Sequence, residues 1–447
     1  MAKKDPSFAK ATEDKQKMEK IVSLCKRRGF VFPGSEIYGG LASTFDYGPM
    51  GVELKNNIKR SWWKYFIQDR GDMTGIDGGI IQSPKLWEAS GHVANFKDPL
   101  VECKKCHHRF RPDKLTDASK CPDCGGEFTE QKMFSGMFKT TIGPIEEEGL
   151  VAYLRPETAG AIFMNYKAVL DSTNKKIPFG IGQIGKAFRN EITTGNFIFR
   201  TLEFEQAEIE YFIKPDSDWN GIFEDWVKYM YGFMDIIGLD KAKMYNNEIS
   251  EKDRAFYSKR TIDMEYQFPF GRDELWAIAY RTDYDLSRHQ IASGQNLEYF
   301  DDEENKKYIP HVIEPTFGVD RTFLAVLSES FEEQELEGGE VRTVLHLKPS
   351  IAPFKVAIFP LLKNKPELIE KAQEVHSGLK KEFNVFWDDR GNIGKRYRYQ
   401  DEIGTPYCVT VDFDTLENGE VTVRDRDSME QVRVKIDELV GWIKARI

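Results

Sequence analysis

Apolar residues recur at helical spacing in three long stretches of the chain before residue 345. The first stretch predicts a helix over 13–28 that ends at Gly29, and its apolar face carries Met18, Ile21, Val22 and Cys25. The second, over 52–68, sets apolar positions against a basic face, and the third, over 219–239, is rich in aromatic residues. The pattern therefore predicts amphipathic helices that pack one face against a core.

The stretch 182–211 is typical of two strands around a short loop. The first strand closes on Arg189 to Glu191, Thr193 to Asn196 are turn formers, and an extended pattern resumes over 199–211. A side-chain period of two places Arg189 and Glu191 on one face of the first strand. One face of the second strand then carries Arg200, Phe204, Gln206 and Glu208. Charges on both faces favour a hairpin that lines a ligand pocket, and the alternative is a solvated edge hairpin.

The alternation changes after an acidic segment at 328–340. Before it, strands are predicted over 273–279 and 308–314. Beyond it we expect strands over 355–361, 385–387, 408–413 and 421–426, a helix over 366–383, and a closing helix marked by Val432, Ile436, Leu439, Val440 and Ile443. The chain is therefore predicted to be α+β, with a domain over 1–345, an insertion at about 92–150 within it, and an α/β domain over 346–447.

Composition limits the class of protein. Hydrophobic residues make up 40% of the chain, and there is no run of eighteen apolar residues. The charged, polar start differs from a signal peptide, so we expect a globular, cytoplasmic protein without a membrane segment. The formal net charge of −10 weakens the case for a nucleic-acid partner without excluding one, because such a partner needs only local basic surface.

Four of the six cysteines form two Cys-x-x-Cys pairs separated by 14 residues. Four thiolates at this spacing can close tetrahedrally on Zn²⁺, and glycines after the second pair permit the tight backbone that bonds the sulfurs. The predicted zinc ligands are Cys103, Cys106, Cys121 and Cys124. No coordination position would stay open, so this metal would support folding rather than catalysis. A metal-free relic or another soft metal is the alternative, and we expect His107 and His108 at the surface and Cys25 and Cys408 buried.

Three stretches, in order along the chain, resemble the class II aminoacyl-tRNA synthetases. FRNE, a loop and FRTLEFEQAE, within 188–208, resemble motif 2 in the form typical of glycyl-tRNA synthetases. Residues 315–321 resemble motif 3 and 78–90 resemble motif 1, supported by LWEASGH at 86–92 and RPETAG at 155–160. The resemblance implies a class II antiparallel sheet flanked by helices, with a zinc-knuckle insertion and a C-terminal anticodon-binding domain. Two positions depart from the family pattern, since Gly160 stands where Gln is usual and Thr316 where Ser is more common.

The resemblance implies a role for each residue of the site. Arg189 and Arg321 are the implied catalytic residues: Arg189 bridges the amino-acid carboxylate and the α-phosphate, and Arg321 sandwiches the adenine with Phe204. Glu191 accepts from the adenine amino group, Arg200 meets the terminal phosphates, and Glu274 holds Mg²⁺ with ATP. The implied ATP-binding set is Arg189, Asn190, Glu191, Phe199, Arg200, Thr201, Leu202, Glu203, Phe204, Glu274, Leu275, Gly318, Val319, Asp320 and Arg321. The implied glycine-binding set is Arg111, Glu157, Phe204, Glu205, Gln206, Ala207, Glu208, Glu314, Pro315, Thr316, Phe317 and Gly318.

Some of these residues have simpler structural roles as alternatives. Pro156 starts a predicted helix that places Glu157 in its first turn, where a carboxylate also favours the helix dipole. Arg111 could be an ordinary exposed arginine, and His289 is expected to be a structural histidine rather than a base.

The implied reaction joins an amino-acid carboxylate to the α-phosphorus of ATP. This carboxylate is already ionised at neutral pH, so no general base is needed, and the difficulty is to bring two anions together. Fixed guanidinium groups and Mg²⁺ would neutralise the negative charge of the two anions and so bring them together. A wall of carboxylates, supplied by Glu157, Glu208 and Glu314 with Gln206 and Thr316, would hold the ammonium group and exclude larger side chains. The implied activity is that of a homodimeric glycine–tRNA ligase, which uses ATP, glycine and tRNA(Gly).

Two other functions stay open. One is a synthetase for serine, threonine or proline, against which FEQAE, RPETAG and WEASGH argue. The other is a noncatalytic RNA-binding protein on a synthetase fold, against which the retained Arg189 and Arg321 argue. Candidate RNA contacts are the basic face with Lys55, Lys59, Arg60 and Lys64, and the interleaved Lys395-Arg396-Tyr397-Arg398-Tyr399, each of which could instead be a solvated charged surface. The apolar Ile80 and Ile81 lie in a region that forms the dimer interface of the family.

Overall fold

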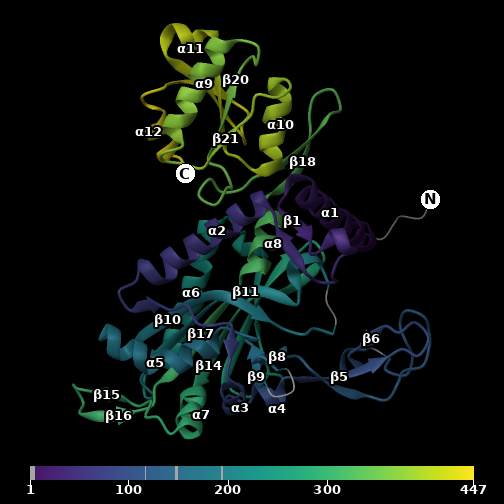
Figure 1. Ribbon diagram of the computed structural model, residues 1–447, viewed down its shortest axis with the longest axis vertical. Coiled ribbons are helices and arrows are strands. Elements are labelled where there is room, and N and C mark those ends of the chain that lie inside the picture. The colour runs from purple at the N-terminus through teal and green to yellow at the C-terminus, as the bar shows by residue number, and fades with distance from the viewer. Residues whose placement is uncertain (1–5, 116, 146–148, 193–194) are drawn as a thin grey trace.

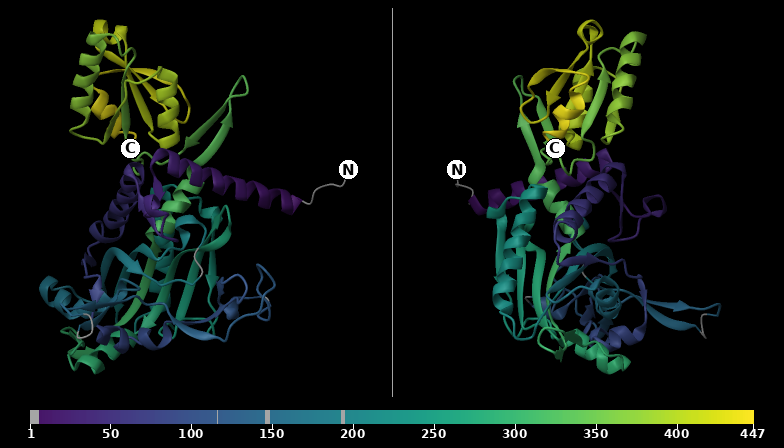
Figure 2. Two further views of the ribbon diagram at one scale, coloured as in Figure 1. Left: turned by 45° about the vertical axis from the view of Figure 1, so that its right-hand side comes forward. Right: turned by 90° about the vertical axis from the view of Figure 1, so that its left-hand side faces the viewer.

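The computed structural model, which describes residues 6–115, 117–145, 149–192 and 195–447, is divided into a larger and a smaller body (Figure 1). Its buried apolar residues form two main hydrophobic cores. The larger core draws its residues from Ile21 to Ile403, and the smaller one from Val356 to Ile443. Figure 2 shows the smaller C-terminal body stacked on one end of the larger one in both views.

A seven-stranded sheet organises the larger body. All neighbouring strands are antiparallel except the last pair, and their order is β12 (Met244–Glu248), β13 (Arg260–Phe268), β14 (Gly271–Thr282), β17 (His311–Gly318), β11 (Glu203–Ile213), β10 (Phe179–Phe188) and β3 (Met73–Gly75). The long strand β11 alternates strictly: Ala207, Ile209 and Tyr211 belong to the large core, while Gln206 and Glu208 face the other side. One face of the sheet is therefore packed and the other is free to build a site.

Helices cover the packed face of this sheet. They present their apolar stripes to the large core and are α2 (Pro49–Trp63), α6 (Trp219–Ile237) and α8 (Val319–Ser330), and α1 (Pro6–Arg28) joins the same core from beside α8. On the other side, a second cluster joins α5 (Ala159–Thr173) and α7 (Tyr284–Ser293) to β10 and β11. The cavity described below lies on this second side.

Short elements fill the rest of the larger body. The segment between α4 (His92–Asn95) and β9 (Leu150–Leu154) carries β5 (Lys97–Glu102), β6 (Arg109–Phe110), β7 (Lys132–Ser135) and β8 (Lys139–Ile142), and β5 and β6 project from the body (Figure 1). The remaining short elements are α3 (Pro84–Ala89), β1 (Val31–Pro33), β2 (Phe45–Tyr47), β4 (Ile81–Gln82), β15 (Tyr299–Asp301), β16 (Lys306–Tyr308), β18 (Phe331–Glu335) and β19 (Val341–Leu345).

The C-terminal body is an α/β layer structure. Its mixed sheet has the order β21 (Val385–Trp387), β20 (Val356–Pro360), β22 (Tyr407–Val411), β23 (Glu420–Asp425) and β24 (Gln431–Lys435). Its helices are α9 (Pro366–Leu379), α10 (Ile393–Ile403), α11 (Phe413–Asn418) and α12 (Leu439–Lys444). On β19, Arg342 is buried and donates to Asp401 of α10 at 2.8 Å, which ties this body to the hairpin β18–β19.

The predicted α+β class is confirmed, while several element ends were predicted wrongly. The helix predicted over 52–68 is α2 followed by a π-helical turn at Lys64–Gln68. Val432 lies on β24, so the closing helix α12 is shorter than the apolar spacing predicted. Glu157 precedes Thr158, the N-cap of α5, and is therefore not in the first turn of that helix. The predicted domain and insertion limits stay predictions.

The predicted hairpin is confirmed as β10 and β11, but both strands are shorter at the loop than expected. Strand β10 ends at Phe188 and β11 begins at Glu203, so Arg189, Glu191 and Arg200 lie in the connection. The predicted turn residues Thr193 and Thr194 lie outside the described residues. Among the residues that are described, no helix combines the length and apolarity needed to cross a bilayer.

Candidate active site

A cavity of about 350 Å³ opens on the free face of the seven-stranded sheet. Ten members of the predicted ATP set line it: Arg189, Glu191, Phe199, Arg200, Thr201, Phe204, Glu274, Gly318, Asp320 and Arg321. So do eight of the predicted glycine set: Glu157, Phe204, Glu205, Gln206, Glu208, Glu314, Thr316 and Gly318. Residues distant in the sequence thus meet in one hollow.

The two arginines expected to hold nucleotide both face this cavity. The Nε of Arg189 donates to the carbonyl of Pro156 at 3.0 Å, and its guanidinium lies 5.3 Å from the centre of the Phe204 ring. The guanidinium of Arg321 lies 4.4 Å from the centre of the Phe199 ring, and its Nη1 donates to the carbonyl of Glu274 at 2.9 Å. A neutral carbonyl fixes Arg189, so its charge stays available to an anionic ligand, whereas Arg321 also pairs with the Glu274 carboxylate.

Glu274 reaches the cavity because of a β-bulge. The register that pairs Met264 with Trp276 also pairs Glu265 with Glu274, so Leu275 is an extra residue in β14. Leu275 is consequently buried in the core, and Glu274 takes the cavity side, where its carboxylate lies 3.2 Å from Arg321. Asp263 lines the same region, and burial, with Glu274 next, raises its pKa to about 7.

Three predicted carboxylates form the inner wall. Glu208 accepts from the backbone N–H of Thr158 at 3.1 Å and from the hydroxyl of Thr316 at 3.1 Å. Glu157 lies 3.2 Å from Nε2 of His92. Although burial opposes it, the charges of His92, Arg281 and Arg189 lower the pKa of Glu157 to about 2. Glu157 is therefore the ionised carboxylate of the wall, whereas burial raises the pKa of Glu208 and raises that of Glu314 well above its usual value.

A buried arginine that sequence reasoning missed lies behind this wall. Arg281 is 0% exposed, donates to both oxygens of Asp285 at 2.7 and 2.9 Å, and donates to Glu314 at 2.6 Å. Tyr257 covers the guanidinium, with its ring centre 3.8 Å away. Arg281 follows Ala277 and Ala279 on the cavity face of β14, and this charge inside an apolar strand was the signal that could have found it.

A second missed residue is Glu210, which continues the face of Gln206 and Glu208 along β11. Its side chain is 0% exposed, and neither carboxylate oxygen has a hydrogen-bond partner among the described residues. Its ligand atoms lie within 4.8 Å of those of Glu208 and Glu314. The period-two spacing of Glu208 and Glu210 in an apolar strand was the available signal.

Asp320 and Glu205 face the cavity but are occupied by structural contacts. Asp320 accepts from Lys55 at 2.7 Å, from the Tyr47 hydroxyl, and from the backbone N–H of Glu205 at 2.6 Å. The Glu205 carboxylate lies 2.9 Å from Lys55 and 2.8 Å from Lys59. Lys55 and Lys59 therefore neutralise carboxylates beneath the cavity, and of the predicted basic face only Arg60 and Lys64 are exposed, so an RNA contact there stays a prediction for those two residues.

Other predicted site residues lie outside the cavity. Arg111 pairs with Asp98 at 2.8 Å and with Asp113 at 2.8 Å, and with Asn190 it lines a neighbouring hollow beside the insertion. Glu203 is exposed and pairs with Lys186. The side chains of Leu275, Val319, Ala207, Pro315 and Phe317 are buried, and Leu202 does not line the cavity. The side chains of these residues therefore do not line the cavity, although Ala207, Pro315 and Phe317 flank residues that do.

Gly160 is explained by packing. A Cβ at this position would meet the Trp87 ring at 2.9 Å and Leu86 at 3.2 Å, so the tight contact with the LWEASGH segment requires glycine. Arg155 is also structural, since it is buried and donates to the carbonyls of Gly78 and Lys186 at 2.6 Å each.

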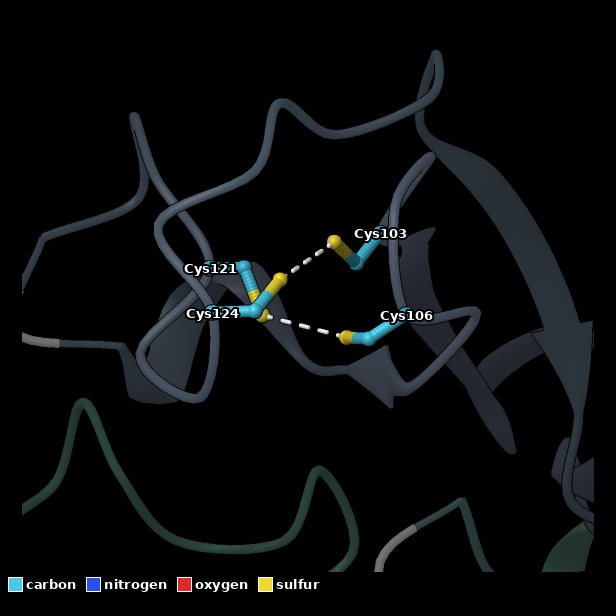
Figure 3. Close-up of side chains that lie close together, drawn as sticks. All are labelled: Cys103, Cys106, Cys121 and Cys124. Carbon is cyan, nitrogen blue, oxygen red and sulfur yellow. Dashed lines mark hydrogen bonds between the residues drawn. The ribbon is translucent and has the colours of Figure 1, made fainter.

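The four predicted zinc ligands point toward one another (Figure 3). The Sγ atoms of Cys103 and Cys124 are 3.4 Å apart, those of Cys106 and Cys121 are 3.6 Å apart, and all four fall within 4.8 Å of one another. Four sulfurs bound tetrahedrally to one Zn²⁺ at about 2.3 Å are roughly 3.8 Å apart, so the spacing suits that ion. The two neighbouring histidines do not belong to this sulfur cluster, because the side chain of His107 is 75% exposed beside Glu102 and His108 pairs with Asp123.

The basic and aromatic stretch 395–399 forms part of α10 rather than an exposed turn. Arg396 is buried and donates to the carbonyl of Pro360 at 2.6 Å, and the Tyr397 hydroxyl contacts Thr410. Arg398 pairs with Glu340. The stretch is thus half buried in a packed helix, and an RNA contact there stays a prediction that only the exposed Lys395 and the 42%-exposed Arg398 side chain could serve.

Comparison with known proteins gives consistent matches over the chain. Residues 138–330 match the tRNA synthetase class II core domain (G, H, P, S and T), and residues 355–446 match the anticodon binding domain. The glycine--tRNA ligase of Clostridium acetobutylicum is 52% identical, over 97% of this chain and 100% of that protein. Those of Clostridium beijerinckii and Lachnospira eligens are 51% and 52% identical, each over 96% of this chain and 98% of the relative.

Proposed function

Because the chain belongs to the glycine--tRNA ligase family, with a class II synthetase core and an anticodon-binding domain, we propose that it activates glycine with ATP and transfers it to tRNA(Gly). The observation that carries the proposal is the single cavity in which Arg189 and Arg321 face Glu157, Glu208 and Glu314. Cationic groups at one end suit the nucleotide, and carboxylates at the other suit an ammonium group.

The residues at the cationic end would compensate charge. Arg189 lies beside the Phe204 ring and the carbonyl of Pro156, next to Glu157, and from there its guanidinium would contact both the substrate carboxylate and the α-phosphate as they meet. Arg321 and Phe204 would sandwich the adenine ring, and Glu191 would accept a hydrogen bond from its amino group. Arg200 would contact the terminal phosphates. Negative charge grows on the phosphoryl oxygens in this reaction, and preorganised guanidinium groups stabilise it. No residue is required to take a proton from the amino acid.

The residues at the acidic end would select glycine. Glu208 and Glu314 would bind the ammonium group, with Glu157, Gln206 and Thr316 narrowing the space around its carbon. Any side chain on that carbon would meet a polar wall whose carboxylates are already held by Thr158, His92 and Arg281. A larger amino acid would push these carboxylates away from their partners and leave buried charge unpaired. The free energy lost in this way exceeds the free energy gained from the added apolar contact.

Two metals fit the donor sets that the chain offers. Glu274 is 42% exposed at the cavity edge and offers the oxygen ligand that Mg²⁺ accompanying ATP prefers. Mg²⁺ would neutralise phosphate charge there. The four-cysteine cluster fits structural Zn²⁺. The backbone at Gly126 passes close to the sulfurs, since a Cβ at this position would lie 2.9 Å from the Cys103 sulfur and 3.3 Å from the Cys124 sulfur, so glycine leaves room for the cluster.

We further expect a homodimer that acts in the cytoplasm. The small sheet β4–β9–β8 exposes a group of apolar side chains, with Ile81 at 56%, Leu150 at 76% and Val151 at 50%. It includes the region expected at the dimer interface, and such a group favours association. Light scattering of the wild type and of Leu150→Asp tests this, and a monomeric wild type would reject it.

Amino-acid-dependent exchange of pyrophosphate into ATP tests the proposed activity. We expect exchange with glycine and exchange with alanine or serine at least about 100-fold weaker in kcat/KM, since the wall rejects even one added carbon. Comparable exchange with alanine or serine would reject the assignment. Aminoacylation of tRNA with labelled glycine then tests the second step.

A further inference from the structure

Glu210 is a buried acid to which the proposed mechanism gives no role. It lies on β11, two residues beyond Glu208 and on the same face, where the register that pairs Tyr211 with Ile313 sets it opposite Glu314. Its two oxygens have no hydrogen-bond partner among the described residues, and its side chain is 0% exposed. An ionised carboxylate in such a place carries a desolvation cost that no hydrogen bond offsets.

The groups around Glu210 offer it no cation of its own. Arg281 on β14 is occupied by Asp285 of α7 and by Glu314 of β17. Glu208 on the same strand is held by Thr158 and Thr316. Farther out, the ionisable groups of the cluster are Glu157 with His92, then Tyr257, and His289 of α7. Burial, then the charge of Glu314, raises the pKa of Glu210 well above its usual value.

A cation that enters the cavity changes this balance. The ligand oxygens of Glu208, Glu210 and Glu314 lie within 4.8 Å of one another, and Glu208 and Glu314 line the cavity. An ammonium group bound to these two would therefore come near enough to Glu210 to favour its charged form. If Glu210 gives up its proton to solvent as the ammonium enters, one positive charge replaces another and the charge of the buried cluster stays the same.

We propose that Glu210 holds a proton while the amino-acid subsite is empty and releases it when the ammonium group of the substrate binds to Glu208 and Glu314. Glu210 is then a positioning residue that couples amino-acid affinity to pH. The inference rests on the proposed function, because it takes glycine as the ligand. Proton release requires that glycine affinity rise with pH, by up to about tenfold per pH unit while one proton is lost.

Calorimetric titration of the full-length protein with glycine, in buffers of different ionisation enthalpy, measures the proton directly. We expect the wild type to release a fraction of one proton at pH 7, and its affinity for glycine to rise from pH 6 to pH 8. Glu210→Gln keeps the shape of the neutral acid but has no proton to lose, so both effects should vanish. In pyrophosphate exchange the same contrast should appear in KM for glycine and not in KM for ATP.

Three further variants make the result decisive. Glu303→Gln, which removes an exposed carboxylate in the turn between β15 and β16, should behave as the wild type. His92→Asn removes the imidazole beside Glu157, and its affinity for glycine should still rise with pH as in the wild type, because that dependence comes from Glu210. Glu210→Met is a second neutral variant should the glutamine variant fail to fold.

No proton release from the wild type, or equal release from the wild type and a folded Glu210 variant, would overturn the inference. Either result would leave the proposed function intact as long as glycine binds. Failure of glycine to bind the wild type or to support exchange would instead reject the proposed function.

Discussion

Replacing Arg281 with methionine is expected to destabilise the larger body more than any exposed charge change. The guanidinium is fully buried and makes three charge-assisted hydrogen bonds, at 2.6, 2.7 and 2.9 Å, to Glu314 and Asp285. Methionine fills much of the same volume without charge, so the loss reports the electrostatic contribution rather than a cavity.

The magnitude follows from the charges left behind. Removal of one partner from a buried ion pair costs about 3 to 5 kcal/mol, and here two carboxylates lose the same partner, which points to about 5 kcal/mol at pH 7.5. Burial already raises the pKa of Glu314, and Arg281 opposes that rise. Without Arg281 the pKa rises further, so the variant takes up a proton that the unfolded chain does not hold. Stability gained in this way is present at low pH and is lost as pH rises. The penalty should therefore shrink on acidification, by about 1.4 kcal/mol per pH unit for each carboxyl that takes up a proton.

Urea unfolding followed by tryptophan fluorescence at pH 7.5 and pH 6 measures the penalty. The matched control is Arg272→Met on the same strand, whose guanidinium is 53% exposed and pairs with Glu265, and which should cost at most about 1 kcal/mol. A loss below about 1 kcal/mol for Arg281→Met, or an equal loss at both pH values, would refute the reasoning.

Three other substitutions test separate parts of the site. Glu157→Gln should lower the free energy of unfolding by about 3 kcal/mol at pH 7, because the pKa of Glu157 is lowered from 4.5 to about 2 in the folded protein. This stability is present above pH 4.5 and is lost as the pH falls toward 2, so in urea unfolding the wild type should converge on the variant in acid. A difference that stays constant with pH would contradict this. Glu208→Gln should raise KM for glycine about tenfold or more with little change in KM for ATP, and equal changes in both would contradict the assignment of the two subsites. Cys121→Ser should abolish the stoichiometric zinc measured by mass spectrometry and lower the melting temperature. The control is Cys408→Ala, which replaces a buried cysteine outside the cluster and should keep the metal. A wild type free of metal would reject the zinc site.

The sequence allowed prediction of much of the site because strand alternation and turn residues are local properties. Period-two spacing correctly placed Phe204, Gln206 and Glu208 on one face of β11, and the paired cysteines correctly predicted a four-sulfur cluster. Both patterns depend on neighbours a few residues apart, which the sequence displays directly.

Other features depend on contacts between distant segments. The bulge at Leu275 moves Glu274 to the cavity face, and regular alternation would have placed it in the core. Lys55 appeared to be a solvated cation until Asp320, 265 residues away, was found to bind it. Arg396 likewise turned out to bind backbone carbonyls in the C-terminal body. Tertiary pairing decides the role of such charges, and helical or strand periodicity does not encode it.

The central claim is that fixed guanidinium groups, rather than a proton-transferring base, drive the joining of glycine to ATP. Glycine-dependent pyrophosphate exchange by the wild type and by Arg189→Ala, each measured across pH 6.5 to 8.5, tests it most directly. We predict a loss of about 100-fold or more in kcat for the variant, comparable to the loss of one preorganised oxyanion donor, and a wild-type kcat that shows no ionisation of a catalytic base in this range. A variant within tenfold of the wild type, or a kcat that falls with a single protonation near neutral pH, would contradict the account.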